Sequence, residues 1–189
     1  MDLFKIIEDK INSGAILYID FDDTLVDFCN SWLVNVRHKK LKGLTFLPNK
    51  KEEIDSFRFF KVDSSGLTEK SLSFIEVYDN IEYMPGALEF INKLKNKEIK
   101  FKILTTTHSS LIEPIKNKLL KDMFNISSKD VIHTKCKQEI IKGNILIDDA
   151  IHNVKNYEDD EKTLIIMIEQ PWNIRYKIKY KIKSLKALL

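Results

Sequence analysis

Cysteine is scarce in this sequence, and long apolar runs are absent from it. The 189 residues include two cysteines, Cys29 and Cys136, which lie far apart and lack the paired spacing of a metal site. We therefore expect reduced thiols in a cytoplasmic protein rather than a disulfide framework. No apolar stretch approaches the roughly 20 residues that span a bilayer, so no membrane association is expected. The opening MDLFKIIEDKINSG mixes charged and apolar residues at helical spacing, so a signal peptide is not expected either.

Acidic residues are missing from the C-terminal segment, residues 172–189. This segment carries six lysine and arginine residues and no acid, whereas the whole chain has a formal net charge of +3. The basic tail 175–186 could contact nucleic acid or another phosphate-rich ligand. Its alternation of Ile and Lys also suits an exposed edge strand that lysines guard against further pairing. We favour the edge strand, which leaves nucleic acid as the less expected partner; the oligomeric state stays open, a homodimer included.

Internal repeats, low-complexity tracts and Gly/Ser linkers are also absent. A hydrophobic content of 43% and a charged content of 31% are typical of a globular protein. Five short apolar runs predict buried parallel strands, at residues 15–19, 99–104, 131–134, 144–147 and 163–168. Helical periodicity lies between them, as in 85–97 and 109–124. This alternation predicts an α/β fold with a mostly parallel, five-stranded sheet flanked by helices.

The interval after the first predicted strand contains no candidate for a parallel core strand. Residues 26–84 hold a helical start, an irregular basic middle, an aromatic cluster (Phe57, Phe59 and Phe60) and a helical stretch near 68–78. We interpret the interval as a small helical cap. It is inserted into a core that consists of residues 1–25 and 85–189.

Reactive side chains follow four of the predicted strands. They are Asp20, Asp22 and Thr24 after the first strand, Thr105 and Thr106 after the second, Lys135 and Lys137 after the third, and Asp148 and Asp149 after the fourth. Ligands of open α/β sheets bind beyond the carboxyl ends of the strands, so these groups should meet. Carboxylates from two strand ends suit a hard divalent cation such as Mg²⁺, which also binds phosphate oxygens. An aspartate can attack phosphorus, a second acid can transfer protons, and hydroxyl and ammonium groups can hold phosphoryl oxygens.

The same motifs carry a resemblance to a known superfamily. DFDDT (20–24) has the DxDxT form of the haloacid-dehalogenase (HAD) phosphohydrolases, and Thr105, Lys137 and Asp148–Asp149 follow in the order of its later motifs. Within it, the chain resembles the 5′(3′)-deoxyribonucleotidase (cytosolic type C) family over about residues 15–175. The segments that carry this closer match are DFDDTLVDF (20–28), LTEKSLSFIE (67–76), YMPGALEFINKL (83–94), ILTTTH (103–108), LIDD (146–149) and QPWN (170–173).

This resemblance implies a Rossmann-like HAD fold and Mg²⁺-dependent hydrolysis of nucleoside monophosphates, deoxyribonucleotides in particular. Asp20 would be the nucleophile that forms an aspartyl-phosphate, and Asp22 the general acid and base, with its backbone carbonyl on the metal. The expected site residues are catalytic Asp20, Asp22, Thr105 and Lys137, substrate-binding Phe28, Thr24 and Thr106, and metal-binding Asp20, Asp22, Asp148 and Asp149. Among them, Phe28 matches an aromatic residue that packs near the nucleobase.

Three departures from the family pattern leave base and sugar preference open. The family commonly has Gly-Val where this chain has Asp23-Thr24, a pocket Trp where it has Ile75, and an Arg where it has Ala150. Two other functions therefore stay under consideration. One is a HAD phosphatase that acts on a sugar phosphate or on the 3′-phosphate end of a nucleic acid. The other is a non-catalytic binding module on the same scaffold.

The lysine motif also has alternatives. The spacing between Lys137 and Asp148 is one residue longer than the resemblance predicts, so Lys135 and Lys142 are possible substitutes.

Overall fold

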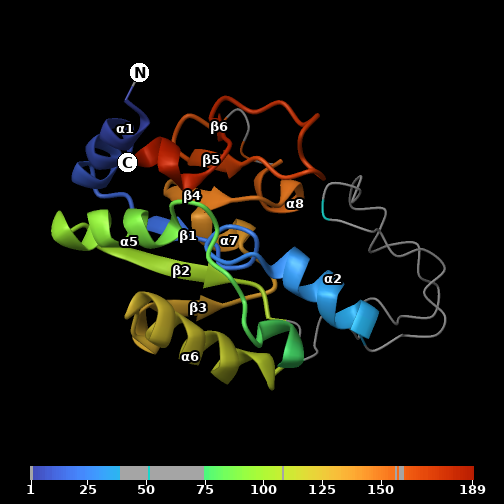
Figure 1. The fold of residues 1–189 in the computed structure, drawn as a ribbon. Coiled ribbons are helices and arrows are strands. Elements are labelled where there is room, and N and C mark those ends of the chain that lie inside the picture. Colours follow the sequence, from blue (N-terminus) through green and yellow to red (C-terminus); the bar gives the residue numbers. More distant parts are fainter. Residues whose placement is uncertain (1, 39–50, 52–74, 108, 156, 158–159) are drawn as a thin grey trace.

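A single parallel sheet forms the centre of the molecule (Figure 1). The computed structural model describes residues 2–38, 51, 75–107, 109–155, 157 and 160–189. The sheet has six strands in the order β3-β2-β1-β4-β5-β6. They are β1 (Leu17–Ile19), β2 (Phe101–Thr105), β3 (Val131–His133), β4 (Ile145–Asp148), β5 (Leu164–Ile168) and β6 (Lys181–Ile182).

The first five strands coincide with the five predicted apolar runs, which confirms the α/β prediction. The predicted number of five was wrong by one, because β6 pairs in parallel with β5 at the edge of the sheet. An edge strand pairs with a neighbouring strand on one side alone and is partly exposed to solvent. Its sequence therefore alternates Ile and Lys and contains no continuous apolar run. Within the basic tail 175–186, the expected edge strand is confirmed for Lys181–Ile182 alone.

Helices connect the strands and cover both faces of the sheet. The α-helices are α1 (Leu3–Asn12), α2 (Phe28–His38), α5 (Ala87–Asn96), α6 (Ile112–Phe124), α7 (Gln138–Ile141) and α8 (Ile151–Val154). Short 3₁₀ helices are η2 (Ile75–Tyr78), η3 (Ser128–Asp130) and η4 (Leu185–Leu188). The Asp2 carboxylate caps α1 by accepting from the N–H groups of Phe4 and Lys5. Pro114 lies in the first turn of α6, where a missing N–H removes no helical hydrogen bond.

Alternate residues of each strand enter different cores. Leu17 and Ile19 of β1 pack with α1, α5 and α6 through partners such as Phe90, whereas Tyr18 packs with α7 and α8 through Ile141 and its neighbours. Both faces of β1 are therefore apolar, as expected for a central parallel strand. No helix in the described part of the chain is long and apolar enough to cross a membrane.

The expected cap is described at its two ends. Helix α2 packs against η2: the Ser31 hydroxyl donates to the Val77 carbonyl, and the Phe28 and Tyr78 rings lie 5.5 Å apart. The aromatic cluster Phe57, Phe59 and Phe60 and most of the helical stretch near 68–78 lie outside the described residues. The division into core and cap remains a prediction.

The strand order creates a natural place for a ligand. The chain leaves β1 toward β2 and β3 and then crosses to β4 on the other side of β1, so a switch point lies between β1 and β4. The register places Ile19 opposite Ile147, so that Asp20 and Asp148 follow side by side at the carboxyl ends. These ends point toward α2 in Figure 1.

Candidate active site

A tight turn after β1 sets the directions of the acidic side chains. The Asp20 N–H continues the β4 ladder by donating to the Ile147 carbonyl at 2.9 Å. The turn then closes with hydrogen bonds from Leu25 N–H to the Phe21 carbonyl and from Asp23 N–H to the Val26 carbonyl. Asp23 has a φ of 55°, the left-handed conformation that glycine adopts most readily. This conformation accounts for the Gly that the related family commonly has at this position.

Lys137 joins the two strand ends at the switch point. Its Nζ lies 2.5 Å from Asp20 Oδ1 and 2.8 Å from Asp148 Oδ2, and its side chain is 2% exposed. Burial lowers the pKa of Lys137, but the facing carboxylates of Asp148 and Asp20 outweigh this effect and raise it. Lys135 and Lys142 are exposed. Of the three candidate lysines, the structure brings Lys137 to the acids.

Three buried carboxylates form a cluster that fits a divalent cation. Asp20, Asp148 and Asp149 each offer an oxygen, and these oxygens lie within 4.8 Å of one another. Burial raises the pKa of Asp20 to about 7 and that of Asp149 well above its usual value, and the charge of Asp148 adds to both effects. Buried like charges repel, so a cation among them would stabilise the ionised forms. The all-oxygen donor set is the type that Mg²⁺ prefers.

Asp148 is more enclosed than Asp149. Its two oxygens accept hydrogen bonds from Ala150 N–H at 2.7 Å and from Asn153 Nδ2, in addition to the ion pair with Lys137. It is fully buried and does not line the adjacent pocket, whereas Asp149 does. Asp149 is therefore the more accessible of the two predicted metal ligands.

A second buried lysine, Lys116, contacts Asp22, and the sequence interpretation missed it. Lys116 Nζ lies 2.5 Å from Asp22 Oδ2, 2.9 Å from Thr105 Oγ1 and 2.6 Å from the Thr106 carbonyl. The lysine is 1% exposed and comes from α6. The other oxygen of Asp22, Oδ1, is buried without a hydrogen-bond partner.

The sequence pattern of α6 could have indicated that Lys116 is buried. Lys116 occupies the buried stripe of α6 at a spacing of four residues with Ile112, Leu120 and Phe124. A lysine in such a stripe must meet carboxylates or other acceptors, because an isolated buried ammonium is very costly.

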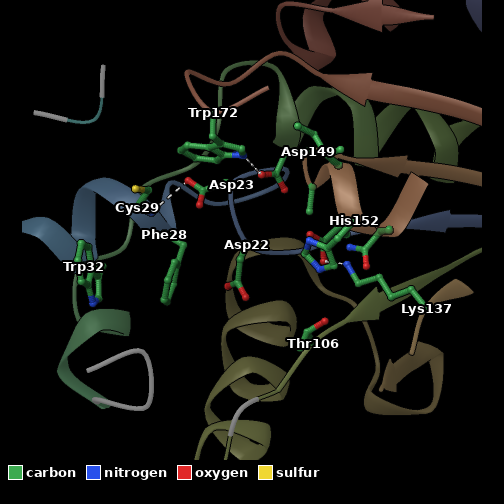
Figure 2. Close-up of a pocket in the computed structure, with 14 residues that line it drawn as sticks. Asp22, Asp23, Phe28, Cys29, Trp32, Thr106, Lys137, Asp149, His152 and Trp172 are labelled. Atoms are coloured by element: carbon green, nitrogen blue, oxygen red, sulfur yellow. Dashed lines mark hydrogen bonds and ion pairs between the residues drawn. The ribbon is translucent and has the colours of Figure 1, made fainter. Parts of the chain in front are cut away.

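A pocket of about 330 Å³ opens beside these charged groups. Figure 2 shows Phe28 and Trp32 on α2 at one side, Trp172 at the top, and Thr106 and Lys137 at the opposite side. The pocket thus combines aromatic walls with one charged end, as a ligand with an apolar ring and an anionic group would require.

The pocket divides the predicted site residues into two groups. Those that line it are Asp20, Asp22, Phe28, Thr106, Lys137 and Asp149. Thr24, Thr105 and Asp148 are fully buried and do not line it. The structure does not bring Thr24, a predicted substrate-binding residue, to the pocket lining, and its buried hydroxyl has no hydrogen-bond partner. Ile75, at the family's Trp position, is exposed, whereas Ala150, at the family's Arg position, lines the pocket.

Asp23 and Asp27 belong to a separate ion cluster. Lys51 Nζ lies 2.9 Å from Asp23 Oδ1 and 2.7 Å from Asp27 Oδ1. Burial raises the pKa of Asp23 to about 6, although Lys51 and the N–H of Cys29 oppose the shift. The Asp23 and Asp27 carboxylates thus form ion pairs with Lys51, whereas Asp20 and Asp22 form theirs with Lys137 and Lys116.

Several solved structures with the same fold are named as hydrolases or phosphatases. A magnesium-bound HAD hydrolase, YfnB from Bacillus subtilis, superposes with a TM-score of 0.57 at 17% identity, over 92% of this chain and 96% of that one. A hydrolase from Pseudomonas syringae gives 0.53 at 14% identity, over 93% and 96%. A HAD phosphatase from Thermococcus onnurineus gives 0.51 at 16% identity, over 92% and 95%. A comparison with curated protein sequences gave no match.

The parallel sheet and these structural relatives define a HAD-type fold. The sequence profile of the family described as 5′ nucleotidase, deoxy (pyrimidine), cytosolic type C matches residues 14–188. The chain belongs to this family, which confirms the predicted resemblance and makes it a phosphoric monoester hydrolase of the 5′-nucleotidase type.

Proposed function

We propose that this phosphatase is a Mg²⁺-dependent nucleotidase that hydrolyses nucleoside monophosphates, deoxyribonucleotides in particular, through an aspartyl-phosphate. The observation that carries the proposal is the position of Asp20. Its buried carboxylate contacts Lys137 and lies in an acid cluster at the charged end of a pocket with aromatic walls. Family membership supports the nucleotide as substrate.

In the first step, the Asp20 oxygen that is not bonded to Lys137 attacks phosphorus. An Asp20 Oδ–P bond forms while the bond between phosphorus and the ester oxygen breaks. Asp22, protonated before this step, gives its proton to the leaving oxygen, so the nucleoside departs with a hydroxyl group. Lys137 and the Thr106 hydroxyl stabilise the negative charge on the phosphoryl oxygens.

In the second step, Asp22 takes a proton from water, and the water oxygen attacks phosphorus. The Asp20 Oδ–P bond breaks, Asp20 regains its carboxylate, and inorganic phosphate leaves. Asp20, Asp148, Asp149 and the Asp22 carbonyl would hold Mg²⁺, which would neutralise charge on the transferred group. Phe28, Trp32 and Trp172 provide flat apolar surfaces for the base.

Replacing the proposed nucleophile tests the mechanism. Asp20→Asn removes the attacking oxygen but keeps the shape of the side chain, so turnover should fall below about one-thousandth of wild type. Phosphate release should be measured with deoxyribo- and ribonucleoside 5′- and 3′-monophosphates, a sugar phosphate and a 3′-phosphorylated oligonucleotide, each with Mg²⁺ or EDTA. We expect Mg²⁺-dependent turnover that is highest for a deoxyribonucleoside monophosphate.

Asp122→Asn is the matched control, because Asp122 is an exposed acid on α6 that pairs with Lys118. It should retain full activity, and circular dichroism should show that both variants fold. Full activity of Asp20→Asn would reject the nucleophile. Faster hydrolysis of the sugar phosphate or of the oligonucleotide would reject a nucleoside monophosphate as the substrate. If no phosphomonoester is hydrolysed, the chain would instead be a non-catalytic binding module.

A further inference from the structure

The QPWN turn, residues 170–173 after β5, touches both acidic loops of the site. The Gln170 Nε2 group donates to the Asp23 carbonyl at 2.7 Å, in the loop after β1. The Asn173 Nδ2 group donates to the Asp149 carbonyl at 2.7 Å and to the Ile168 carbonyl at 2.8 Å. One short turn from the neighbouring strand therefore holds the backbones of the loops after β1 and β4.

Trp172 contacts the Asp149 side chain itself. Its Nε1–H donates to Asp149 Oδ2 at 2.8 Å, and Figure 2 shows this bond at the upper edge of the pocket. The indole ring is half-buried and lines the pocket, and Lys51 Nζ lies 5.5 Å from the ring centroid. The indole therefore contacts a cation through its ring and a carboxylate through its N–H.

We propose that Trp172 is a positioning residue that fixes the Asp149 carboxylate for the cation, with Gln170 and Asn173 fixing the loops beneath it. This inference rests on the proposed Mg²⁺ dependence. A carboxylate oxygen that accepts the indole N–H cannot rotate freely, so the second oxygen keeps one direction. Groups that orient metal ligands in this way commonly contribute about 10- to 100-fold to metal affinity.

The two proposed metal-binding carboxylates, Asp148 and Asp149, are held in place by different partners. Asp148 is held by Lys137, Ala150 N–H and Asn153. Asp149 is one residue further from the strand and faces the pocket. The side-chain hydrogen bond from Trp172 supplies the constraint at this less enclosed position.

Trp172→Phe tests the inference because it removes the N–H and keeps an aromatic ring in the pocket. Isothermal titration with Mg²⁺ and no substrate should show binding about 10-fold weaker than wild type. A merely structural role would lower the unfolding midpoint without changing Mg²⁺ affinity.

Trp32→Phe is the matched control, because Trp32 lines the same pocket from α2. It should bind Mg²⁺ as wild type does. NMR of the ¹⁵N-labelled wild-type protein gives a second readout, which does not depend on whether Trp172→Phe folds. The protein has two indole N–H signals, and the one that remains in Trp32→Phe belongs to Trp172. Addition of Mg²⁺ should shift this signal. Equal Mg²⁺ binding by wild type and Trp172→Phe, or an unmoved Trp172 signal, would overturn this inference alone. A wild type that binds no Mg²⁺ would overturn the proposed metal dependence, and this inference with it.

Discussion

Asp20 and Asp22 are two residues apart, yet each contacts a different buried lysine. Lys137 contacts Asp20 from the start of α7, and Lys116 contacts Asp22 from α6. In the chain, Lys116 follows β2 on the way to β3, and Lys137 follows β3 on the way to β4. Lys116 also contacts Thr105, so it links the proposed proton-transfer residue to the end of β2.

Lys116→Met tests this link at the scale of one residue. Methionine has a similar length but no ammonium, so the Asp22 carboxylate and the Thr105 hydroxyl lose a donor. We expect kcat to fall by about tenfold or more, but by less than the roughly 10²- to 10⁴-fold that a general acid or base itself contributes. The free energy of unfolding should fall by about 1–3 kcal/mol, the cost of a buried acceptor left unpaired. Turnover of a deoxyribonucleoside monophosphate and urea unfolding measure the two effects.

Lys118→Met is the control on the same helix. Lys118 pairs with Asp122 on the surface, with side chains 78% and 54% exposed, so its loss should cost less than about 0.5 kcal/mol. Its activity should equal that of wild type. A Lys116→Met enzyme with wild-type kcat would show that the Asp22 contact has no part in turnover.

At the scale of elements, one glycine controls how the C-terminal η4 packs on α5. Gly86 precedes α5 with a φ of 84°, and a Cβ there would lie 2.5 Å from Lys186 N. Lys93 of α5 binds the carbonyls of Leu188 and Leu189 at 2.8 and 2.7 Å, so the end of the chain is fixed against this helix. The two elements meet through backbone atoms, which cannot yield as a flexible side chain can.

Gly86→Ala should therefore destabilise the fold by about 2–5 kcal/mol, from left-handed strain plus overpacking. Gly143→Ala is the matched control, because Gly143 has a φ of 75° but a Cβ there would meet no atom within 4 Å beyond its chain neighbours. The control should lose about 1–2 kcal/mol from strain alone. Urea unfolding measures both free energies, and equal losses would contradict tight packing of η4 against α5.

The elements were predictable where the signal is local. The five core strands are apolar runs, and the residues that follow them converge because parallel strands share one carboxyl edge. Lys116 and Trp172 were not assigned, because their roles depend on partners 94 and 23 residues away in the sequence. Strand β6 was not counted among the core strands, since its two residues carry one lysine and no apolar run.

At the scale of the whole molecule, stability toward acid depends in part on a neutral histidine. His133 lies at the end of β3 with Nε2 3.1 Å from Asn117 Oδ1 and Nδ1 2.7 Å from Thr107 Oγ1. Because Asn117 Oδ1 accepts, Nε2 carries the proton and the Thr107 hydroxyl donates to Nδ1, which is the arrangement of a neutral ring. This network connects β3, α6 and the loop after β2.

Burial lowers the pKa of His133; Lys116 lowers it further, while Glu113 and Asp22 oppose the shift. The unfolded chain therefore binds a proton at higher pH than the folded protein does. The contribution of neutral His133 is complete above about pH 6.5 and is lost as the pH falls from there toward the lower folded pKa. His133→Gln, which keeps a hydrogen-bonding side chain but does not titrate, should lose less stability than wild type between about pH 7.5 and about pH 5.5. Urea unfolding at each pH measures the difference, and parallel pH curves for the two proteins would show that His133 is equally easy to protonate in the folded and unfolded states.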